Sequence, residues 1–236
     1  MELLFIAFEN IFWIIRQTVS EFFLYGGCLW WYKLRFSLML SWLGSSPNAA
    51  VLRYFRQHAP QRLQNGCALP DDCGDLTYGE TLPGTAYKLL KTVDASEQTK
   101  IVDLGCGRGV IPLTAALAFG AEAIGIDIVP DYIDRGRRAL DLLSLKNKVN
   151  FAESDFSYCP LPEADIYFLT AVCLDSQTWQ SLQKNLLKYA PTGAKIISVS
   201  RKLQGKEWEL CNHSAQAFTW DRATVYIYRK KWATSV

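Results

Sequence analysis

The sequence changes character at Val102-Asp103-Leu104-Gly105-Cys106-Gly107-Arg108-Gly109, where a short apolar run gives way to glycine at every second position. Glycine adopts backbone conformations that a Cβ atom forbids, and it lets a ligand approach the main chain closely. The stretch therefore predicts a tight turn between a buried strand and a helix. Turns of this kind at the carboxyl end of a strand are typical of sites that bind a nucleotide-like cofactor.

The residues around this turn alternate between predicted strands and predicted helices. Short apolar runs predict strands at residues 100–104, 122–127, 148–152, 165–170 and 195–200, and longer amphipathic runs predict helices at about 110–119, 131–144 and 176–190. Two further runs, 207–219 and 223–230, predict an antiparallel hairpin at the edge of the sheet. This order predicts an α/β fold with a doubly wound, mostly parallel, Rossmann-like sheet of seven strands and helices on both faces.

Three acidic residues lie at or near the carboxyl ends of successive predicted strands. Asp127 ends the second strand and is suited to accept hydrogen bonds from two ribose hydroxyls. Asp155 follows the third strand and can accept from an adenine amino group, with Phe156 beside the ring. With Asp103 in the first strand, we expect three carboxylates around one nucleoside.

The spacing of the glycines and the charge beside them distinguish two cofactors. Dinucleotide enzymes favour G-x-G-x-x-G, and their helix N-terminus faces an anionic pyrophosphate. Here the run is G-x-G-x-G, and Asp103 precedes it. A carboxylate at this point repels a pyrophosphate but suits the cationic amino-acid end of S-adenosylmethionine. We therefore expect S-adenosylmethionine, and an NAD-type cofactor is the alternative.

These residues resemble the class I S-adenosylmethionine-dependent methyltransferases over roughly residues 78–230. Ahead of the first strand, Leu76-Thr77-Tyr78-Gly79-Glu80-Thr81 is similar to the Tyr-Gly-Glu-Thr segment of the disruptor-of-telomeric-silencing (non-SET) lysine methyltransferases. That resemblance implies that the segment holds the methionine end of the cofactor. Taken alone, Glu80 can meet an ammonium group or be a solvated acid in the first turn of a helix, and Thr81 can cap that helix.

The predicted cofactor site extends from this segment to the end of the fourth strand. Cys106 within it needs only to be small. The predicted cofactor-binding residues are Tyr78, Glu80, Thr81, Asp103, Gly105, Cys106, Gly107, Gly109, Asp127, Ile128, Asp155, Phe156 and Thr170.

The end of the chain carries a second part of the same resemblance. Phe218-Thr219-Trp220, followed by Val225-Tyr226-Ile227-Tyr228, is similar to the closing hairpin of these lysine methyltransferases, in which a tryptophan and a tyrosine line the lysine channel. It implies that Trp220 and Tyr78 are channel residues, and ordinary core aromatics are the alternative. The chain departs from the family at residues 169–175, where the family has paired asparagines and an aromatic, and it has no basic tail for nucleosomal DNA.

The pattern predicts a methyltransferase that acts on a protein lysine. Methyl transfer from a sulfonium requires alignment and exclusion of water, without a dedicated base, and an aromatic channel favours the neutral form of a lysine. Three alternatives stay open from the sequence: a methyltransferase of a lipid or hydrophobic small molecule, a nucleotide-dependent oxidoreductase, and a non-catalytic scaffold.

Residues 1–58 form a hydrophobic extension, which residues 59–77 link to a predicted catalytic domain at 78–236. Glu2, Glu9 and Arg16 recur every seven residues, so a helix here has a thin polar stripe and a wide apolar arc. Gly26-Gly27 predicts a bend, after which tryptophan and tyrosine stand next to lysine and arginine. This mixture is typical of helices in a membrane interface. The alternative is a helical lid packed on the domain or on a second subunit.

Composition limits the other possibilities. The 236 residues have a net charge of +2 and are 50% hydrophobic, which predicts a folded protein and gives no sign of a nucleic-acid partner. The 7 cysteines and 2 histidines lack the spacing of zinc sites or of a disulfide framework. We expect no metal, reduced cysteines, and a cytoplasmic location or one at the cytoplasmic face of a membrane.

Overall fold

The structure is a computed structural model of the 236-residue chain. It describes residues 15–41, 43, 50, 53, 54, 57, 79–172 and 174–231. The predicted linker at 59–77 and the predicted site residue Tyr78 lie outside the described residues.

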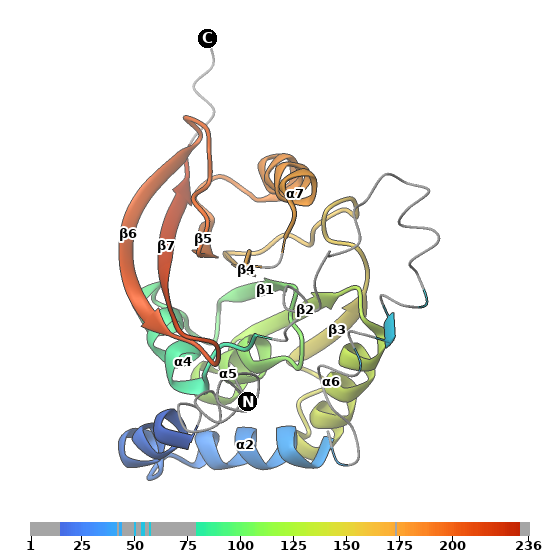
Figure 1. The fold of residues 1–236 in the computed structure, drawn as a ribbon, viewed down its shortest axis with the longest axis vertical. Helices are drawn as coiled ribbons and strands as arrows, with labels where there is room; N and C mark the ends of the chain where they lie inside the picture. The colour runs from blue at the N-terminus through green and yellow to red at the C-terminus, as the bar shows by residue number, and fades with distance from the viewer. Residues whose placement is uncertain are drawn as a thin grey trace, which may run out of the picture.

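A seven-stranded sheet forms the centre of the fold, with the strand order β3-β2-β1-β4-β5-β7-β6 (Figure 1). The first five strands in chain order pair in parallel, while β7 runs antiparallel to both β5 and β6. The predicted parallel sheet with a closing hairpin is therefore confirmed. The strands are β1 (Lys100–Leu104), β2 (Glu122–Asp127), β3 (Val149–Glu153), β4 (Ile166–Thr170), β5 (Lys195–Val199), β6 (Trp208–Ala217) and β7 (Arg222–Lys230).

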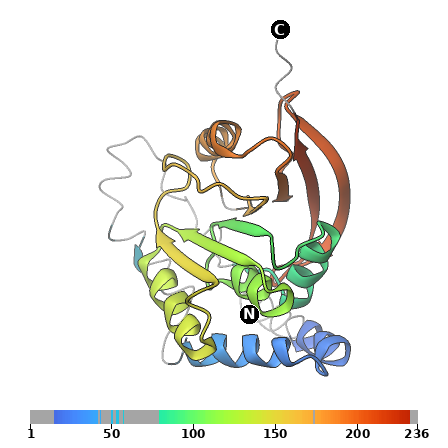
Figure 2. The same ribbon diagram turned by 180° about the vertical axis from the view of Figure 1, so that it is seen from behind.

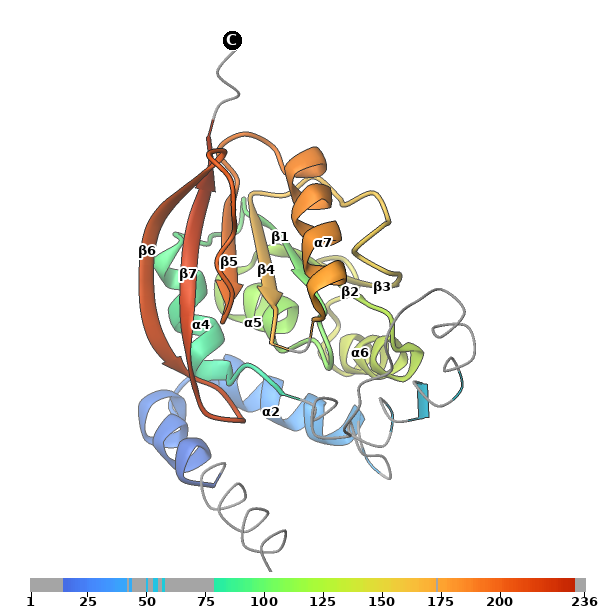
Figure 3. The same cartoon turned by 45° about the horizontal axis from the view of Figure 1, so that its top comes forward.

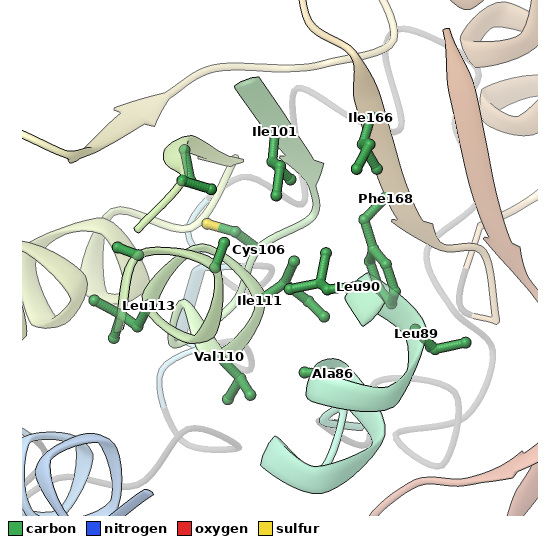
Figure 4. Close-up of a cluster of buried hydrophobic side chains, with 14 of the residues drawn as sticks. Ala86, Leu89, Leu90, Ile101, Cys106, Val110, Ile111, Leu113, Ile166 and Phe168 are labelled. Carbon is green, nitrogen blue, oxygen red and sulfur yellow. The ribbon is translucent and has the colours of Figure 1, made fainter. Parts of the chain in front are cut away.

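Helices cover both faces of this sheet (Figures 1 and 2). One apolar cluster joins side chains of α4 (Pro83–Thr92), α5 (Val110–Phe119) and α6 (Pro130–Leu143) to one face of the strands. A second cluster joins α7 (Ser176–Tyr189) to the other face. Figure 4 shows the first cluster, where side chains of α4 and α5 gather against those of β1 and β4. The doubly wound arrangement is thus present.

The bounds of α5 and the start of α7 are those that the local sequence predicts. Gly109 and Gly120, on either side of α5, both have the left-handed backbone that favours glycine. Asp175 precedes α7, and its carboxylate accepts a hydrogen bond from the Thr178 N–H at 2.7 Å. Asp175 therefore caps α7.

The ring of Phe151 in β3 packs against three glycines from separate elements. The side chain of Phe151 is 1% exposed. A Cβ atom would lie 2.4 Å from this ring at Gly109, 2.7 Å at Gly125 and 2.9 Å at Gly136. The glycine turn, β2 and α6 can therefore approach β3 this closely only because these residues lack side chains.

The N-terminal extension contains two helices that lie against the domain. Residues 15–25 are helical, the chain turns at Gly26 and Gly27 as predicted, and α2 (Leu29–Ser41) follows. Leu34 and Leu38 of α2 belong to the core cluster of α4, α5 and α6, and the Arg135 guanidinium of α6 donates to the Ser41 carbonyl at 2.9 Å. Within the described part of the chain, no helix combines the length and the apolar character needed to cross a membrane.

Gly136→Ala should lower the free energy of unfolding by about 1–3 kcal/mol, because the new methyl group overlaps a ring that has no free space around it. At an unobstructed position inside a helix, the same change adds up to about 1 kcal/mol of stability. Urea unfolding would measure the difference. In the Phe151→Leu background the loss should shrink, and a stability gain from Gly136→Ala alone would contradict this packing.

Candidate functional site

The candidate site lies at the carboxyl ends of β1, β2 and β4. In the strand order, β1 stands between β2 and β4, so the chain leaves β1 toward one half of the sheet and later returns to the other. Cofactors of open α/β sheets bind in the crevice that this reversal creates. The predicted glycine turn follows β1 directly at this point.

The glycine turn is held by the main chain of β2. The N–H groups of Gly105 and Cys106 both donate to the Ile126 carbonyl, at 2.8 and 3.0 Å. Gly105 has φ +83°, yet a Cβ there would meet only the Phe156 ring at an ordinary 3.6 Å. The left-handed backbone therefore requires glycine at position 105. The space that a Cβ would occupy there is open apart from the Phe156 ring. Gly109 is required by the Phe151 ring, a reason that differs from the predicted approach of a ligand.

Both carboxylate oxygens of Asp127 are held by backbone N–H groups. One carboxylate oxygen accepts from the Gly107 N–H at 2.8 Å and the other from the Val129 N–H at 3.0 Å. Each oxygen can accept a further bond, which suits a pair of ribose hydroxyls. Burial raises the pKa of Asp127 from 3.8 to about 6, although backbone N–H groups act in the opposite direction. The group is therefore ionised at neutral pH.

Asp103 and Cys106 lie below the surface of the site. Asp103 is 3% exposed, and burial followed by the negative charge of Asp127 raises its pKa well above the usual range. Burial, with the charges of Asp127 and Asp103, also raises the pKa of the Cys106 thiol. Cys106 is accordingly a neutral small side chain, as the sequence predicts.

The turn after β3 is fixed by a residue that sequence reasoning missed. Asp155 accepts from the Ser157 N–H at 2.9 Å. The side-chain amide of Asn185, which is buried on α7, donates to the Phe156 carbonyl at 2.8 Å and to the Cys159 carbonyl at 2.7 Å. An asparagine on the apolar face of a helix was the available signal. It holds the Phe156 ring beside the glycine turn.

Two segments far apart in the sequence form a second wall of the site. The Glu80 N–H donates to the Thr219 hydroxyl at 2.8 Å, and the Thr219 N–H donates to the Glu80 carbonyl at 3.0 Å. Thr81 and Phe218 form a β-bridge. The Trp220 ring stacks on Phe218 with centroids 4.6 Å apart and lies directly against the backbone of Gly79. The two segments that resemble the lysine methyltransferases are thus adjacent.

An ion pair joins this wall to the glycine turn. The Arg108 guanidinium donates to both carboxylate oxygens of Glu80, through Nε at 2.8 Å and through one terminal nitrogen. The Glu80 side chain is 11% exposed, so it is not the solvated acid that the sequence allowed as an alternative. Sequence reasoning missed this role of Arg108, because the residue lies between two glycines of the turn and no pattern links it to Glu80.

The remaining predicted residues take different positions. Thr170 ends β4 and is half-buried, and Ile128 packs beside Val129 and Tyr132. Thr81 does not cap α4, which was the simpler role predicted for it: the residue before the helix is Leu82. The Gly84 N–H in its first turn instead donates to the Glu21 carboxylate at 2.7 Å.

The site fits an adenosine that carries an amino-acid tail. Gly105 leaves its face open, and Asp127 keeps acceptor positions for hydroxyl groups. The Ser157 hydroxyl oxygen, beside Asp155, is buried without a hydrogen-bond partner among the described residues. Such an orphaned group is typical of a place that a ligand completes.

Comparison with known proteins identifies the fold family. A family model described as the O-methyltransferase domain matches residues 80–218, which is more than half of the chain. The chain belongs to this family. It is a class I S-adenosylmethionine-dependent methyltransferase, and S-adenosylmethionine is its cofactor. The narrower resemblance to the disruptor-of-telomeric-silencing enzymes has no support among these matches. A search of curated proteins with this sequence found no match.

Solved structures share the fold of the methyltransferase. An RNA methyltransferase from Salinibacter ruber in complex with S-adenosyl-L-homocysteine is 24% identical, with a TM-score of 0.56 over 66% of this chain and 95% of that chain. TrmN from Thermus thermophilus is 19% identical, with a TM-score of 0.55 over 63% of this chain. The match spans only 48% of TrmN. A methyltransferase from Thiobacillus denitrificans, also with S-adenosyl-L-homocysteine, is 13% identical with a TM-score of 0.52 and covers 64% of this chain and 92% of that one.

The affinity of the methyltransferase for S-adenosylhomocysteine should fall about tenfold between pH 7.5 and pH 5, because protonation of Asp127 removes acceptor positions one pH unit below its pKa of about 6. Calorimetry would measure this step. Asp127→Asn should bind weakly at both pH values, whereas Asp134→Asn, an exposed acid on α6, should keep the wild-type profile. A step that persists in Asp127→Asn would assign the titration to another group.

The same pKa has the opposite effect on folding without cofactor. A raised carboxyl pKa contributes stability that is fully present below the ordinary value of 3.8 and is lost as the pH rises through about 6. As the pH rises through about 6, the affinity for the cofactor should therefore increase, while the contribution of Asp127 to the free energy of unfolding decreases.

Proposed function

We propose that this methyltransferase transfers a methyl group to the side-chain nitrogen of a protein lysine. The observation that carries the proposal is the half-buried Trp220 ring, held against Gly79 by the pairing of residues 79–81 with 218–220, in the wall that Glu80 joins to the glycine turn through Arg108. An aromatic wall disfavours the charged ammonium form and so favours the neutral amine that can attack. Tyr78 is the proposed second wall residue.

Different residues of the site would hold different parts of the cofactor. When bound, S-adenosylmethionine supplies a methyl group on a positively charged sulfur that leaves as a neutral thioether. Asp127 would accept the ribose hydroxyls, and Asp155 and Phe156 would contact the adenine. Glu80 and Arg108 present one negative and one positive group, which matches an amino acid that carries both charges. Alignment of a neutral lysine amine with the methyl carbon, opposite the sulfur–carbon bond that breaks, would supply about 7–11 kcal/mol. The methylated nitrogen would then lose its extra proton to water.

A hydroxyl group on a lipid or hydrophobic small molecule is the second candidate acceptor. The description of the matching family, an O-methyltransferase domain, favours it. The expected lack of a nucleic-acid partner stays a prediction, since the similar structure from Salinibacter ruber is described as an RNA methyltransferase.

We also propose the organisation and location that the sequence predicts. Residues 78–236 would be the catalytic domain, 59–77 the linker and 1–58 the extension. The four described cysteines at 28, 106, 159 and 211 are free thiols, which supports a cytoplasmic location.

The acceptor can be identified by labelling. Purified full-length protein and methyl-labelled S-adenosylmethionine are added to extracts of cells that lack the gene, and protein, lipid and RNA are separated. Label in protein that is recovered as methyl-lysine after acid hydrolysis would support the proposal. Label in lipid or small molecules would favour the second candidate, and label in RNA would overturn both. The Asp127→Ala variant, which should not bind the cofactor, gives the background level of label.

Trp220→Leu should lower the rate of methyl transfer about 10–100-fold, because the channel loses its aromatic face, while S-adenosylhomocysteine binds with nearly unchanged affinity. Trp220→Phe should recover most of the rate. Single-turnover transfer and calorimetry would separate the two effects. If Trp220→Leu lost rate and cofactor affinity equally, the result would show that Trp220 only packs against its neighbours and does not line an acceptor channel.

A further inference from the structure

We propose that the two N-terminal helices, residues 15–25 and α2, bind an anionic lipid surface through one continuous apolar face. We call it the outward face; it is made up of Phe22, Phe23, Leu29, Tyr32, Phe36 and Met39. Phe23 is 81% exposed and Leu29 is 68% exposed. The surface does not depend on which acceptor the enzyme methylates.

The outward face is separate from the surface that packs on the domain. On α2, Leu29, Tyr32, Phe36 and Met39 recur at intervals of three and four residues, so they form one stripe along the helix. Leu34 and Leu38 belong to the opposite stripe and are buried in the core. A helix at the edge of a folded domain needs only one apolar side. The second side of α2 therefore serves a partner.

The charges next to the outward face favour anionic lipid as that partner. Arg16 and Lys33 are exposed. Glu21 is the single acid among residues 15–41, and it is buried and paired with Arg35 at 2.6 Å. The exposed charge of this region is thus entirely basic. Basic side chains beside exposed aromatic and aliphatic groups are attracted to negatively charged headgroups, into which the apolar groups insert.

The sequence immediately before this region continues its apolar character. Residues 3–8 are Leu-Leu-Phe-Ile-Ala-Phe, and Arg16 follows Glu2 and Glu9 in the seven-residue repeat. A lipid surface accepts a long series of apolar side chains without a matching shape. A second protein copy would need a complementary groove for each of them.

Glu21 connects the outward face to the catalytic site. One carboxylate oxygen accepts from the Gly84 N–H of α4 at 2.7 Å, and the other accepts from Arg35 at 2.6 Å and from the Trp31 indole at 3.4 Å. Residues 79–81, which form the wall with residues 218–220, lead through Leu82 into α4. Figure 3 shows residues 15–25, the start of α4 and the turn between β6 and β7 at the same end of the molecule. A lipid surface bound there lies beside the acceptor wall.

Vesicle binding tests the proposal without cofactor or acceptor. The full-length protein is sedimented with vesicles of equal parts phosphatidylglycerol and phosphatidylcholine, and with vesicles of phosphatidylcholine alone. Wild type should bind the anionic vesicles, and the double variant Phe23→Glu/Phe36→Glu should bind them at least about tenfold more weakly. Leu187→Glu, on α7, places the same charge at another exposed leucine and should bind like wild type. S-adenosylhomocysteine affinity checks that each variant is folded.

Three results would overturn the proposal. The first is a wild type that does not bind anionic vesicles. The second is a double variant that binds them like wild type. The third is a wild-type dimer that does not bind vesicles and that Phe23→Glu/Phe36→Glu converts to monomers in light scattering, since the face would then belong to a second copy. A failure to find methyl-lysine would overturn the proposed acceptor and leave vesicle binding intact.

Discussion

The Phe151 ring fills a space that three glycines leave empty, and both the sheet and the cofactor loop depend on this contact. Gly109 belongs to the turn after β1, Gly125 to β2 and Gly136 to α6, so a single side chain sets the distances between three elements. The contact also fixes the height of the glycine turn above the sheet. Asp127 then holds that turn from the side through the Gly107 N–H. The shape of the cofactor crevice is therefore a property of the core as much as of the residues that line it.

Two segments far apart in the sequence form the wall of the crevice, and an ion pair joins this wall to the glycine turn. The wall formed by residues 79–81 and 218–220 is built from main-chain hydrogen bonds and a stacked tryptophan, which give it a fixed position. The pairing of Glu80 with Arg108 brings opposite charges to the junction of this wall with the glycine turn. Because the pair is largely shielded from water, its geometry is stiffer than that of a surface pair. The pairing of Arg108 with Glu80 thus joins the two parts of the site.

The sequence predicted the elements of the domain almost residue by residue, because their signals are local. Apolar periodicity marked the strands and helices, and glycines marked the turn after the first strand and the bend at Gly26 and Gly27. Such local signals do not reveal contacts between residues that are far apart in the sequence. The pairing of Arg108 with Glu80, the two bonds of Asn185 and the Glu21–Gly84 bond all join residues that no pattern connects. Thr81 shows the limit clearly: its type and place suggested a helix cap, but the fold uses it in a bridge to Phe218 and caps α4 from another helix.

The buried carboxylate of Glu21 makes the N-terminal helices part of the folded unit. They supply a hydrogen-bond acceptor to the first turn of α4 and two leucines, Leu34 and Leu38, to the core cluster of α4, α5 and α6. Without residues 15–41 the Gly84 N–H would lose its acceptor, and apolar side chains beneath α2 would meet water. A shortened protein that begins at α4 would therefore give up stability together with the outward face.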